Sequence, residues 1–146
     1  ADFVIPLGQA IVRREGTDVT VIAYMGMMYR AMEAAEQLAR DGVSVEIVDP
    51  RTLQPLDAGT ILASVRKTHR AVVVEAGAGF AGMGSELSAV ITEQAFDDLD
   101  APVERVTGVP APMPYARNLE KLKTPSTERI VEAIRRVCYQ NGNGSR

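Results

Sequence analysis

Short runs of β-branched residues alternate with amphipathic segments, and this alternation constrains the fold more than any other feature of the chain. The runs that have the length and side chains of buried strands are Val19–Ala23, Val43–Val48, Ala71–Val74 and Pro102–Val106. Between them lie segments with apolar side chains at helical spacing and charged side chains on the opposite face. Strands that alternate with helices of this length predict a largely parallel sheet with helices on both faces.

Local signals predict where several of these elements begin and end. Gly42 follows the first amphipathic segment and is typical of a helix stop. Asp57 is suited to the N-cap of the next helix, and Ser85 is suited to the N-cap of the third. Thr124 followed by Pro125 predicts the start of the last helix, with proline at its first position.

The two ends of the chain and one internal stretch are predicted to lie outside the main layers. Leu7–Arg13 is expected to add an edge strand, joined to the next strand by the turn at Glu15–Thr17. The proline-rich run Pro110–Pro114 is expected to be extended over the surface. We expect one domain over residues 1–139 and a disordered polar tail over residues 140–146.

Composition excludes several classes of protein. The 146 residues carry a net charge of −3 with acids and bases interspersed, whereas nucleic-acid binding needs a clustered positive surface. No apolar run approaches the roughly 20 residues of a membrane span, and the first residues do not resemble a signal peptide. The single cysteine, Cys138, cannot form an internal disulfide. We therefore expect a bacterial cytoplasmic or mitochondrial-matrix protein with no nucleic-acid or membrane partner.

The segment Gly77–Gly82 reads G-x-G-x-x-G, follows a predicted strand and precedes a predicted helix. This context is typical of a dinucleotide-binding turn, with Gly77, Gly79 and Gly82 as its glycines. The turn follows the third main strand, however, and the next strand ends without the acid that would bind a ribose. A tight turn that lets a helix pack close to the sheet is the favoured interpretation, and a nucleotide-binding domain is the alternative.

The candidates for catalysis and metal binding are few. His69 is the only histidine, and it precedes a strand, whereas ligands of open parallel sheets bind beyond the carboxyl ends. A surface loop is therefore its favoured interpretation. One histidine and one cysteine cannot supply the four ligands of a structural zinc site. Cys138 lies on the apolar stripe of the last helix, where a thiol is expected to be inert.

Five polar residues are expected near the carboxyl ends of the strands, namely Tyr24, Asp49, Arg51, Glu75 and Thr107. Asp49 and Arg51 can pair and fix a loop, or Arg51 can hold an anion. Asp49 and Glu75 can form a carboxylate pair for acid–base chemistry, but the sequence supplies no nucleophile or cofactor for them. We interpret these residues as structural and predict no catalytic, cofactor-binding or metal-binding residue.

The methionines at the junction of the first main strand and helix are also notable. Met25, Met27 and Met28 cluster there, and flexible thioethers suit irregular contacts. We expect them to pack in the core or at an interface.

An ordered set of motifs resembles the C-terminal domain of thiamine-diphosphate-dependent 2-oxo acid dehydrogenase beta subunits. The segment Asp49–Asp57 is similar to the D-x-R-T-x-x-P-x-D pattern of that family. The matches continue in order through Ser64–Thr68, Leu99–Pro102, Arg105–Gly108 and Val109–Ala116. The resemblance covers the chain from about Pro6 to Tyr139, and the P-M-P-Y-A run resembles the pyruvate type more than the branched-chain type.

The resemblance implies a fold and a place for the chemistry. It implies a three-layer α/β/α domain with a mixed five-stranded sheet, one strand of which is antiparallel, as in the transketolase C-terminal domain. It also implies that thiamine diphosphate and Mg²⁺ bind elsewhere in a longer parent protein, between the alpha subunit and a pyrimidine-binding domain that has no match here. The chain alone is expected to be inactive and to bind no cofactor.

The partners that the resemblance implies are an alpha subunit, a second beta subunit and the subunit-binding domain of the dihydrolipoyl acyltransferase. Asp100, in the L-D-A-P match, is the residue expected to contact that last partner, since an exposed carboxylate can pair with a basic residue. An ordinary acid in a loop before a strand is the alternative. Gln140–Arg146 extends beyond the usual end of the family, which puts a terminal contact in doubt. Acetoin and branched-chain 2-oxo acids remain alternatives for the substrate of the parent enzyme. The matching domain of a transketolase-like enzyme is a further alternative for the chain, against which the L-D-A-P and P-M-P-Y-A runs argue.

Overall fold

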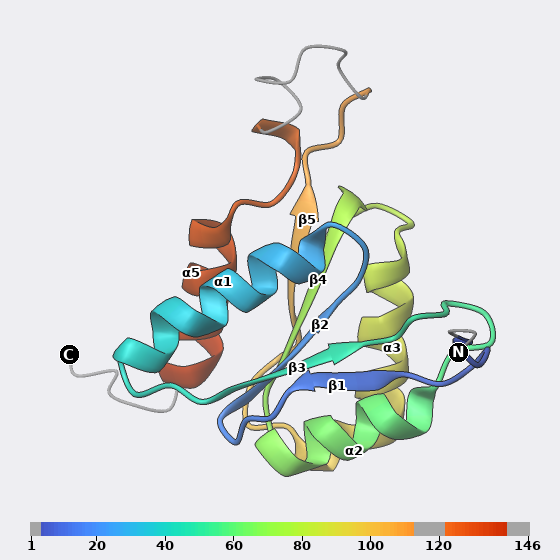
Figure 1. The fold of residues 1–146 in the computed structure, drawn as a ribbon, viewed down its shortest axis with the longest axis horizontal. Helices are drawn as coiled ribbons and strands as arrows, with labels where there is room; N and C mark the ends of the chain where they lie inside the picture. The colour runs from blue at the N-terminus through green and yellow to red at the C-terminus, as the bar shows by residue number, and fades with distance from the viewer. Residues whose placement is uncertain (1–3, 113–121, 140–146) are drawn as a thin grey trace.

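The computed structural model describes residues 4–112 and 122–139 of the chain. Its five-stranded sheet has the order β1-β3-β2-β4-β5 (Figure 1). The strands are β1 (Ile11–Arg14), β2 (Val19–Ala23), β3 (Val45–Asp49), β4 (Ala71–Ala78) and β5 (Glu104–Gly108). β1 is antiparallel to β3, and every other neighbouring pair is parallel. The predicted mixed, mostly parallel sheet is therefore confirmed.

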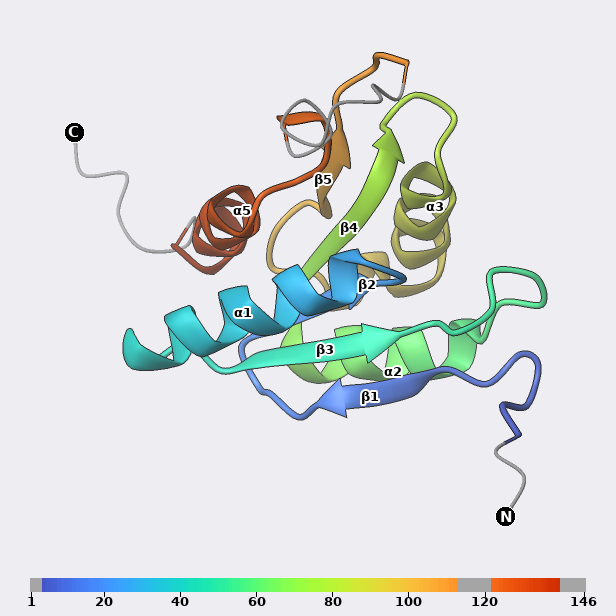
Figure 2. The ribbon, with the colours of Figure 1, turned by 45° about the horizontal axis from the view of Figure 1, so that its top comes forward.

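Two helices cover each face of the sheet. α1 (Met27–Arg40) and α5 (Thr127–Tyr139) lie against each other on one face. α2 (Ala58–Thr68) and α3 (Met83–Ala95) lie on the other, followed by the short 3₁₀ helix η1 (Phe96–Asp98) (Figures 1 and 2). The three-layer α/β/α architecture is confirmed.

The central strands are buried on both faces, which explains their nearly continuous apolar sequence. In β2, the side chains of Val19 and Val21 join the core beneath α1 and α5. Ile22 points the other way and joins the core beneath α2 and α3. Successive side chains of a strand point to opposite faces, so one strand contributes to two separate cores.

Two predicted helix boundaries are confirmed by local geometry. Gly42 has φ of +79° directly after the C-cap residue of α1, a conformation that glycine adopts without steric cost. The Asp57 carboxylate caps α2, because its Oδ1 accepts a hydrogen bond from the Thr60 N–H over 3.1 Å.

The predicted end of the third main strand and start of the next helix are wrong. β4 continues to Ala78, which pairs with Gly108 of β5, so Gly77 lies in the strand and not in a turn. α3 begins at Met83 with Gly82 as its N-cap. Ser85 lies inside the first turn, and its hydroxyl donates to the Gly79 carbonyl over 3.1 Å. The longer strand arises from pairing with β5, which local sequence does not encode.

The last helix also begins later than predicted. α5 starts at Thr127, and the Ser126 hydroxyl accepts a hydrogen bond from the Arg129 N–H over 3.3 Å, as an N-cap does. The Arg30 guanidinium donates to the Pro125 carbonyl, which fixes that residue outside the helix. Ser126 therefore takes the capping role predicted for Thr124.

The remaining differences are small shifts at strand ends. β3 and β5 each begin two residues later than predicted, and the edge strand begins at Ile11. That edge strand pairs with β3 and not with the strand that follows it in sequence. The end of the predicted proline-rich extended run, at 113–114, and the predicted disordered tail at 140–146 lie outside the described residues. Within the described ranges, no helix combines the length and apolar composition needed to cross a bilayer.

Candidate docking site

Asp100 lies between η1 and β5, at the end of the sheet where β4 begins. Its side chain is 45% exposed, and one of its oxygens lies 3.2 Å from a guanidinium nitrogen of Arg70. The Asp100 N–H donates to the His69 carbonyl over 2.8 Å, so the loop is tied to the end of α2. The carboxylate is accessible while its backbone is fixed.

A shallow depression of about 500 Å³ lies beside Asp100. Phe96 is its most exposed large apolar residue, at 68%. The other residues around it, all from α3 or from the loop before β5, are Ser88, Thr92, Leu99, Ala101, Pro102 and Val103. An exposed aromatic ring beside an accessible carboxylate is an arrangement suited to a partner with both apolar and basic side chains.

Contacts with α2 hold the loop that carries Asp100. The Arg66 guanidinium forms an ion pair with Asp98 over 3.2 Å and donates to the Gln94 carbonyl over 2.8 Å. Nδ1 of His69 lies 2.8 Å from the Asp98 carbonyl. A loop held in this way loses little conformational freedom when a partner binds, which favours docking.

His69 occupies the position that the sequence predicted. It is the exposed C-cap residue of α2, with φ of +61°, at the amino end of β4. Its ring contact to the Asp98 carbonyl gives it a role in fixing the loop. The interpretation as a surface connection is confirmed.

Sequence reasoning proposed Asp100 as a docking residue, and it did not include Phe96 or Arg70 in the candidate site. Phe96 directly follows α3 in the run F-D-D-L-D-A-P, and an aromatic residue among acids is a signal that was available. Arg70 directly follows His69 in the sequence, where no local pattern singles it out. Its pairing with Asp100 depends on the approach of the α2–β4 junction to the loop before β5, which no local pattern encodes.

The residues predicted at the carboxyl ends of the strands separate into different environments. The Tyr24 hydroxyl donates to Oε2 of Glu75 over 3.1 Å, and Glu75 is only 3% exposed. Burial, followed by the charge of Glu75 and this hydrogen bond, raises the pKa of Tyr24 well above its ordinary value. Asp49 ends β3, which β2 separates from β4, and its carboxylate is paired elsewhere. Asp49 and Glu75 therefore do not form the carboxylate pair that the sequence left open.

Asp49 pairs with Arg13 of β1 over 3.0 Å, not with Arg51 as the sequence suggested. Arg51 instead donates its backbone N–H to Oδ1 of Asp49 over 3.0 Å. Its Nε is buried and has no hydrogen-bond partner among the described residues. A role for Arg51 in holding an anion stays a prediction.

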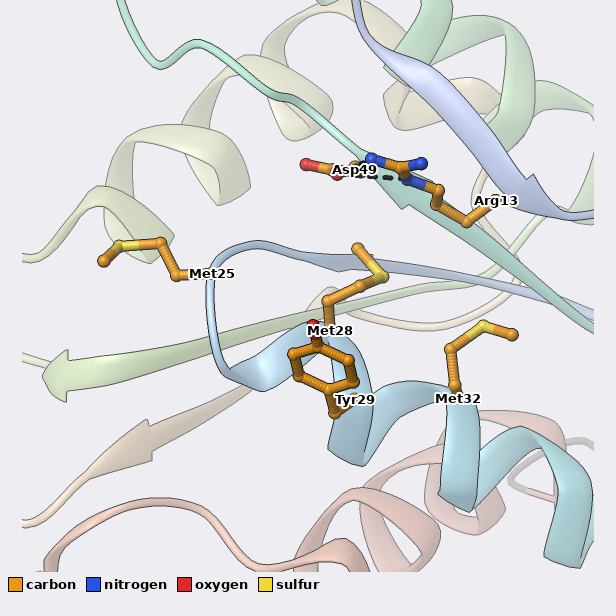
Figure 3. A pocket seen from close by; sticks show the side chains of 6 residues that line it. All are labelled: Arg13, Met25, Met28, Tyr29, Met32 and Asp49. Atoms are coloured by element: carbon orange, nitrogen blue, oxygen red, sulfur yellow. Dashed lines mark hydrogen bonds and ion pairs between the residues drawn. The ribbon is translucent and has the colours of Figure 1, made fainter.

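The Arg13–Asp49 pair borders an open cleft of about 430 Å³ that methionines line (Figure 3). Met28 and Met32 project from α1 toward this ion pair, and Met25 and Tyr29 complete the lining. Met27, in contrast, is buried in the core. The predicted methionine cluster thus divides between core packing and an open surface. Among the described residues that line the cleft, the Asp49 carboxylate is paired with the Arg13 guanidinium.

Two further predicted residues have structural surroundings. The Thr107 carbonyl accepts a hydrogen bond from Arg129 over 2.9 Å, which ties β5 to α5. Cys138 is half-buried on α5, and burial raises the pKa of its thiol, so the reactive thiolate is disfavoured. Among the described residues, no three His, Cys, Asp or Glu side chains gather as a metal site would require.

The three layers and the mixed five-stranded sheet define an α/β/α domain, a class whose members differ in function. The family model of the transketolase C-terminal domain matches residues 8–130, so the chain belongs to that family. A solved structure of a split-gene transketolase, an inactive beta4 tetramer, superposes with a TM-score of 0.80 at 27% identity. The alignment covers 94% of this chain and 43% of that one.

Within this family, the chain is similar to beta subunits of the pyruvate dehydrogenase E1 component. It is 46% identical over 140 residues to the mitochondrial subunit of Dictyostelium discoideum, covering 96% of this chain and 39% of that protein. It is 48% identical over 141 residues to the mitochondrial beta-1 subunit of Arabidopsis thaliana, covering 97% and 39%. The subunit of the bacterium Rickettsia felis is 46% identical, with coverage of 92% and 41%. The chain thus spans about two fifths of the length of these relatives.

Proposed function

We propose that this chain is the assembly and partner-docking domain of a beta subunit in a pyruvate dehydrogenase-type 2-oxo acid dehydrogenase. The parent complex would decarboxylate the 2-oxo acid and transfer the acyl group to a lipoyl group. The proposal is supported by the identity of 46–48% to pyruvate dehydrogenase beta subunits. The structural observation that carries it is the accessible Asp100 carboxylate beside the exposed ring of Phe96.

The partner that fits this surface is the subunit-binding domain of the dihydrolipoyl acyltransferase. A basic side chain of that domain would join Arg70 at the Asp100 carboxylate, which has two oxygens and can accept from both guanidinium and ammonium groups. The existing pair with Arg70 is a surface ion pair and contributes little stability, so it presents a small barrier to the new contact. Phe96 would supply the apolar anchor that such an interface needs.

The parent's cofactors would be thiamine diphosphate and Mg²⁺, and the described residues do not fit a site for them. They gather no set of metal-binding side chains. The glycine-rich turn also fits a diphosphate poorly, because the Glu75 carboxylate already lies against Gly82 and Gly84. We therefore assign no chemical step to these residues and propose that the chain acts through its surfaces.

The subunit partners follow from the same relatives. An alpha subunit and a second beta subunit would complete a heterotetramer with the parent of this chain. The relatives include mitochondrial and bacterial proteins, so the mitochondrial matrix or the bacterial cytoplasm is the proposed location. The alternatives of an acetoin or branched-chain substrate have no structural observation in their favour.

Titration calorimetry with the purified subunit-binding domain tests the docking proposal. We expect binding by the wild-type chain and a loss of about tenfold in affinity for Asp100→Ala, which corresponds to about 1.4 kcal/mol. Phe96→Ala should weaken binding through lost apolar contact. Asp97→Ala is the matched control, because it removes an exposed acid from the same segment and should change affinity less than twofold. Equal losses for Asp97→Ala and Asp100→Ala would contradict a specific role for Asp100.

A further inference from the structure

Glu75 is a buried acid whose carboxylate points at the start of α3. Its Oε2 accepts the hydrogen bond from Tyr24, but its Oε1 is buried with no hydrogen-bond partner among the described residues. Leaving a charged oxygen without a partner inside a protein is costly, so a group nearby is expected to stabilise it.

Gly82, the last glycine of the G-x-G-x-x-G segment, and Gly84, two residues beyond it, provide the room for this carboxylate. A Cβ on Gly82 would lie 2.6 Å from Oε1 of Glu75, and a Cβ on Gly84 would lie at the same distance. Side-chain atoms do not approach this closely, so a Cβ at either position would force the Glu75 carboxylate to shift. Gly82 is also close to the backbone, since its Cβ would lie 2.7 Å from the Ala78 carbonyl oxygen. A substitution at Gly84 therefore tests the contact with the carboxylate more directly than one at Gly82 does.

The start of α3 offers the positive potential that an anion needs. The first N–H groups of a helix generally lack partners within it, and the aligned peptide dipoles add partial positive charge. In α3 the Ser85 N–H already donates to the Gly82 carbonyl over 3.0 Å, so the charge of the dipole and the N–H groups before Ser85 would act on an anion. The N-cap residue, Gly82, has no side chain to accept a hydrogen bond. α3 has 13 residues, which is long enough for an appreciable dipole. In nucleotide-binding turns of this sequence pattern, phosphate oxygens occupy this position.

We propose that the glycine-rich turn before α3 is an anion site that the Glu75 carboxylate fills from within, so that a tetrahedral oxyanion can bind there only when Glu75 is removed. The inference is independent of the docking proposal. It gives a reason for the last glycine of the dinucleotide-type pattern, because Gly82 leaves room for the Glu75 carboxylate and not for a nucleotide phosphate. The Tyr24 hydroxyl donates to the other oxygen of the carboxylate, Oε2, over 3.1 Å, which restricts its movement.

Thermal unfolding with inorganic phosphate as the probe tests this proposal, with chloride at equal ionic strength as the reference. Glu75→Ala should unfold about 4 °C below the wild type, because the start of α3 loses its anion. Phosphate at ten times its dissociation constant should return a similar shift to Glu75→Ala and leave the wild type unchanged. Glu86→Ala is the matched control, since it removes an exposed acid from the same first turn and should show no phosphate effect.

A second variant keeps the test decisive if Glu75→Ala does not fold. Glu75→Gln keeps the volume of the side chain and removes its charge, so it should unfold at a lower temperature than the wild type and show no response to phosphate. An unchanged unfolding temperature for Glu75→Gln would overturn the proposal. Equal stabilisation of the wild type and Glu75→Ala by phosphate would overturn it too.

Discussion

Oε1 of Glu46 accepts a hydrogen bond from the Ser64 hydroxyl over 2.5 Å, between β3 and α2. Glu46 is only 1% exposed, so this contact lies inside the domain. The Thr20 hydroxyl oxygen lies 2.7 Å from those of both Ser64 and Thr68. The result is a buried polar layer that joins two strands to α2. Because its members satisfy one another, the layer fixes how α2 sits on the sheet.

The first prediction concerns Glu46 and acid. Burial alone would raise the pKa of Glu46, but hydrogen bonds from Lys67, Ser64 and the Gly16 N–H outweigh it and hold the pKa below its usual value. A lowered pKa stabilises the fold above the unfolded-state pKa, about 4.3 for glutamate, and this contribution is lost as pH falls through the folded-state pKa. Glu46→Gln should therefore lose about 1–3 kcal/mol of unfolding free energy at pH 7.

Urea unfolding at several pH values between 7 and 3.5 measures this effect. The difference between Glu46→Gln and the wild type should shrink as the pH falls below about 4.3. Glu15→Gln is the control, because Glu15 also contacts Lys67 but is exposed, and its effect should stay within about 0.5 kcal/mol. A difference for Glu46→Gln that is the same at every pH would contradict this account.

The second prediction concerns Asp57, which links the edge strand to α2. Its carboxylate accepts hydrogen bonds from the Thr60 N–H, the Ala10 N–H and the Thr60 hydroxyl, and together they hold its pKa below the usual value. Asp57→Ala should lose about 1–2 kcal/mol of unfolding free energy at pH 7. The lowered pKa means that this loss should diminish as the pH falls below about 3.9.

Hydrogen exchange separates the two roles of Asp57. Loss of the contact to Ala10 should speed exchange of the Ala10 amide and of the amides at the start of β1. Thr60→Ala is the control, because it removes the hydroxyl contact and leaves the Ala10 contact in place. Unchanged exchange at Ala10 in Asp57→Ala would show that the edge strand is held by other contacts.

Asp57 and Gly42 show which parts of the fold are readable from sequence. Each acts within a few residues of its own position, one by capping a helix and the other by adopting positive φ, so residue type and spacing are sufficient. The end of the third main strand was misjudged because β4 is lengthened to Ala78 by pairing with β5. Cross-strand pairing of this kind depends on residues far apart in the chain.

The candidate docking site was likewise predictable from sequence only in part. Asp100 was proposed from a motif, but its ion pair with Arg70 and its position beside the Phe96 depression required the three-dimensional arrangement. The pairing of Asp49 with Arg13 was missed for the same reason. From sequence alone, several arginines are possible partners for a carboxylate at the end of a strand. The sequence does not show that an antiparallel edge strand brings Arg13 beside Asp49.

The third prediction compares two glycines that differ in the space available for a Cβ atom. A Cβ on Gly16 would lie 2.2 Å from the backbone nitrogen of Glu46, and backbone cannot move aside cheaply. Gly16→Ala should therefore lose at least about 2 kcal/mol of unfolding free energy. Gly59 lies in the first turn of α2, where a Cβ would meet only Asp57 Oδ1 at 3.6 Å. Gly59→Ala should be neutral or gain up to about 1 kcal/mol. Urea unfolding of both variants measures these values, and equal effects would contradict the prediction.

The fourth prediction is a coupling between Gly84 and Glu75. Gly84→Ala alone should lose about 1–3 kcal/mol, because the new Cβ would lie 2.6 Å from Oε1 and 3.1 Å from Cδ of Glu75. In the Glu75→Ala background the nearest of the contacts left is Val73 Cγ1 at 3.5 Å, an ordinary van der Waals distance, so alanine's helix propensity should make the substitution neutral or favourable.

A double-mutant cycle by urea unfolding isolates the coupling free energy between the two substitutions. Residues in contact show non-additive effects, whereas separate sites add within about 0.5 kcal/mol. Gly59→Ala combined with Glu75→Ala is the matched control and should be additive, because Gly59 lies on α2 and its Cβ would not meet Glu75. A coupling of at least about 1 kcal/mol for Gly84 with Glu75 would place the carboxylate against the start of α3 in solution. If the Gly84 pair were additive as well, the glycine would have to be explained by something other than the carboxylate, and the internal anion at the start of α3 would have to be abandoned.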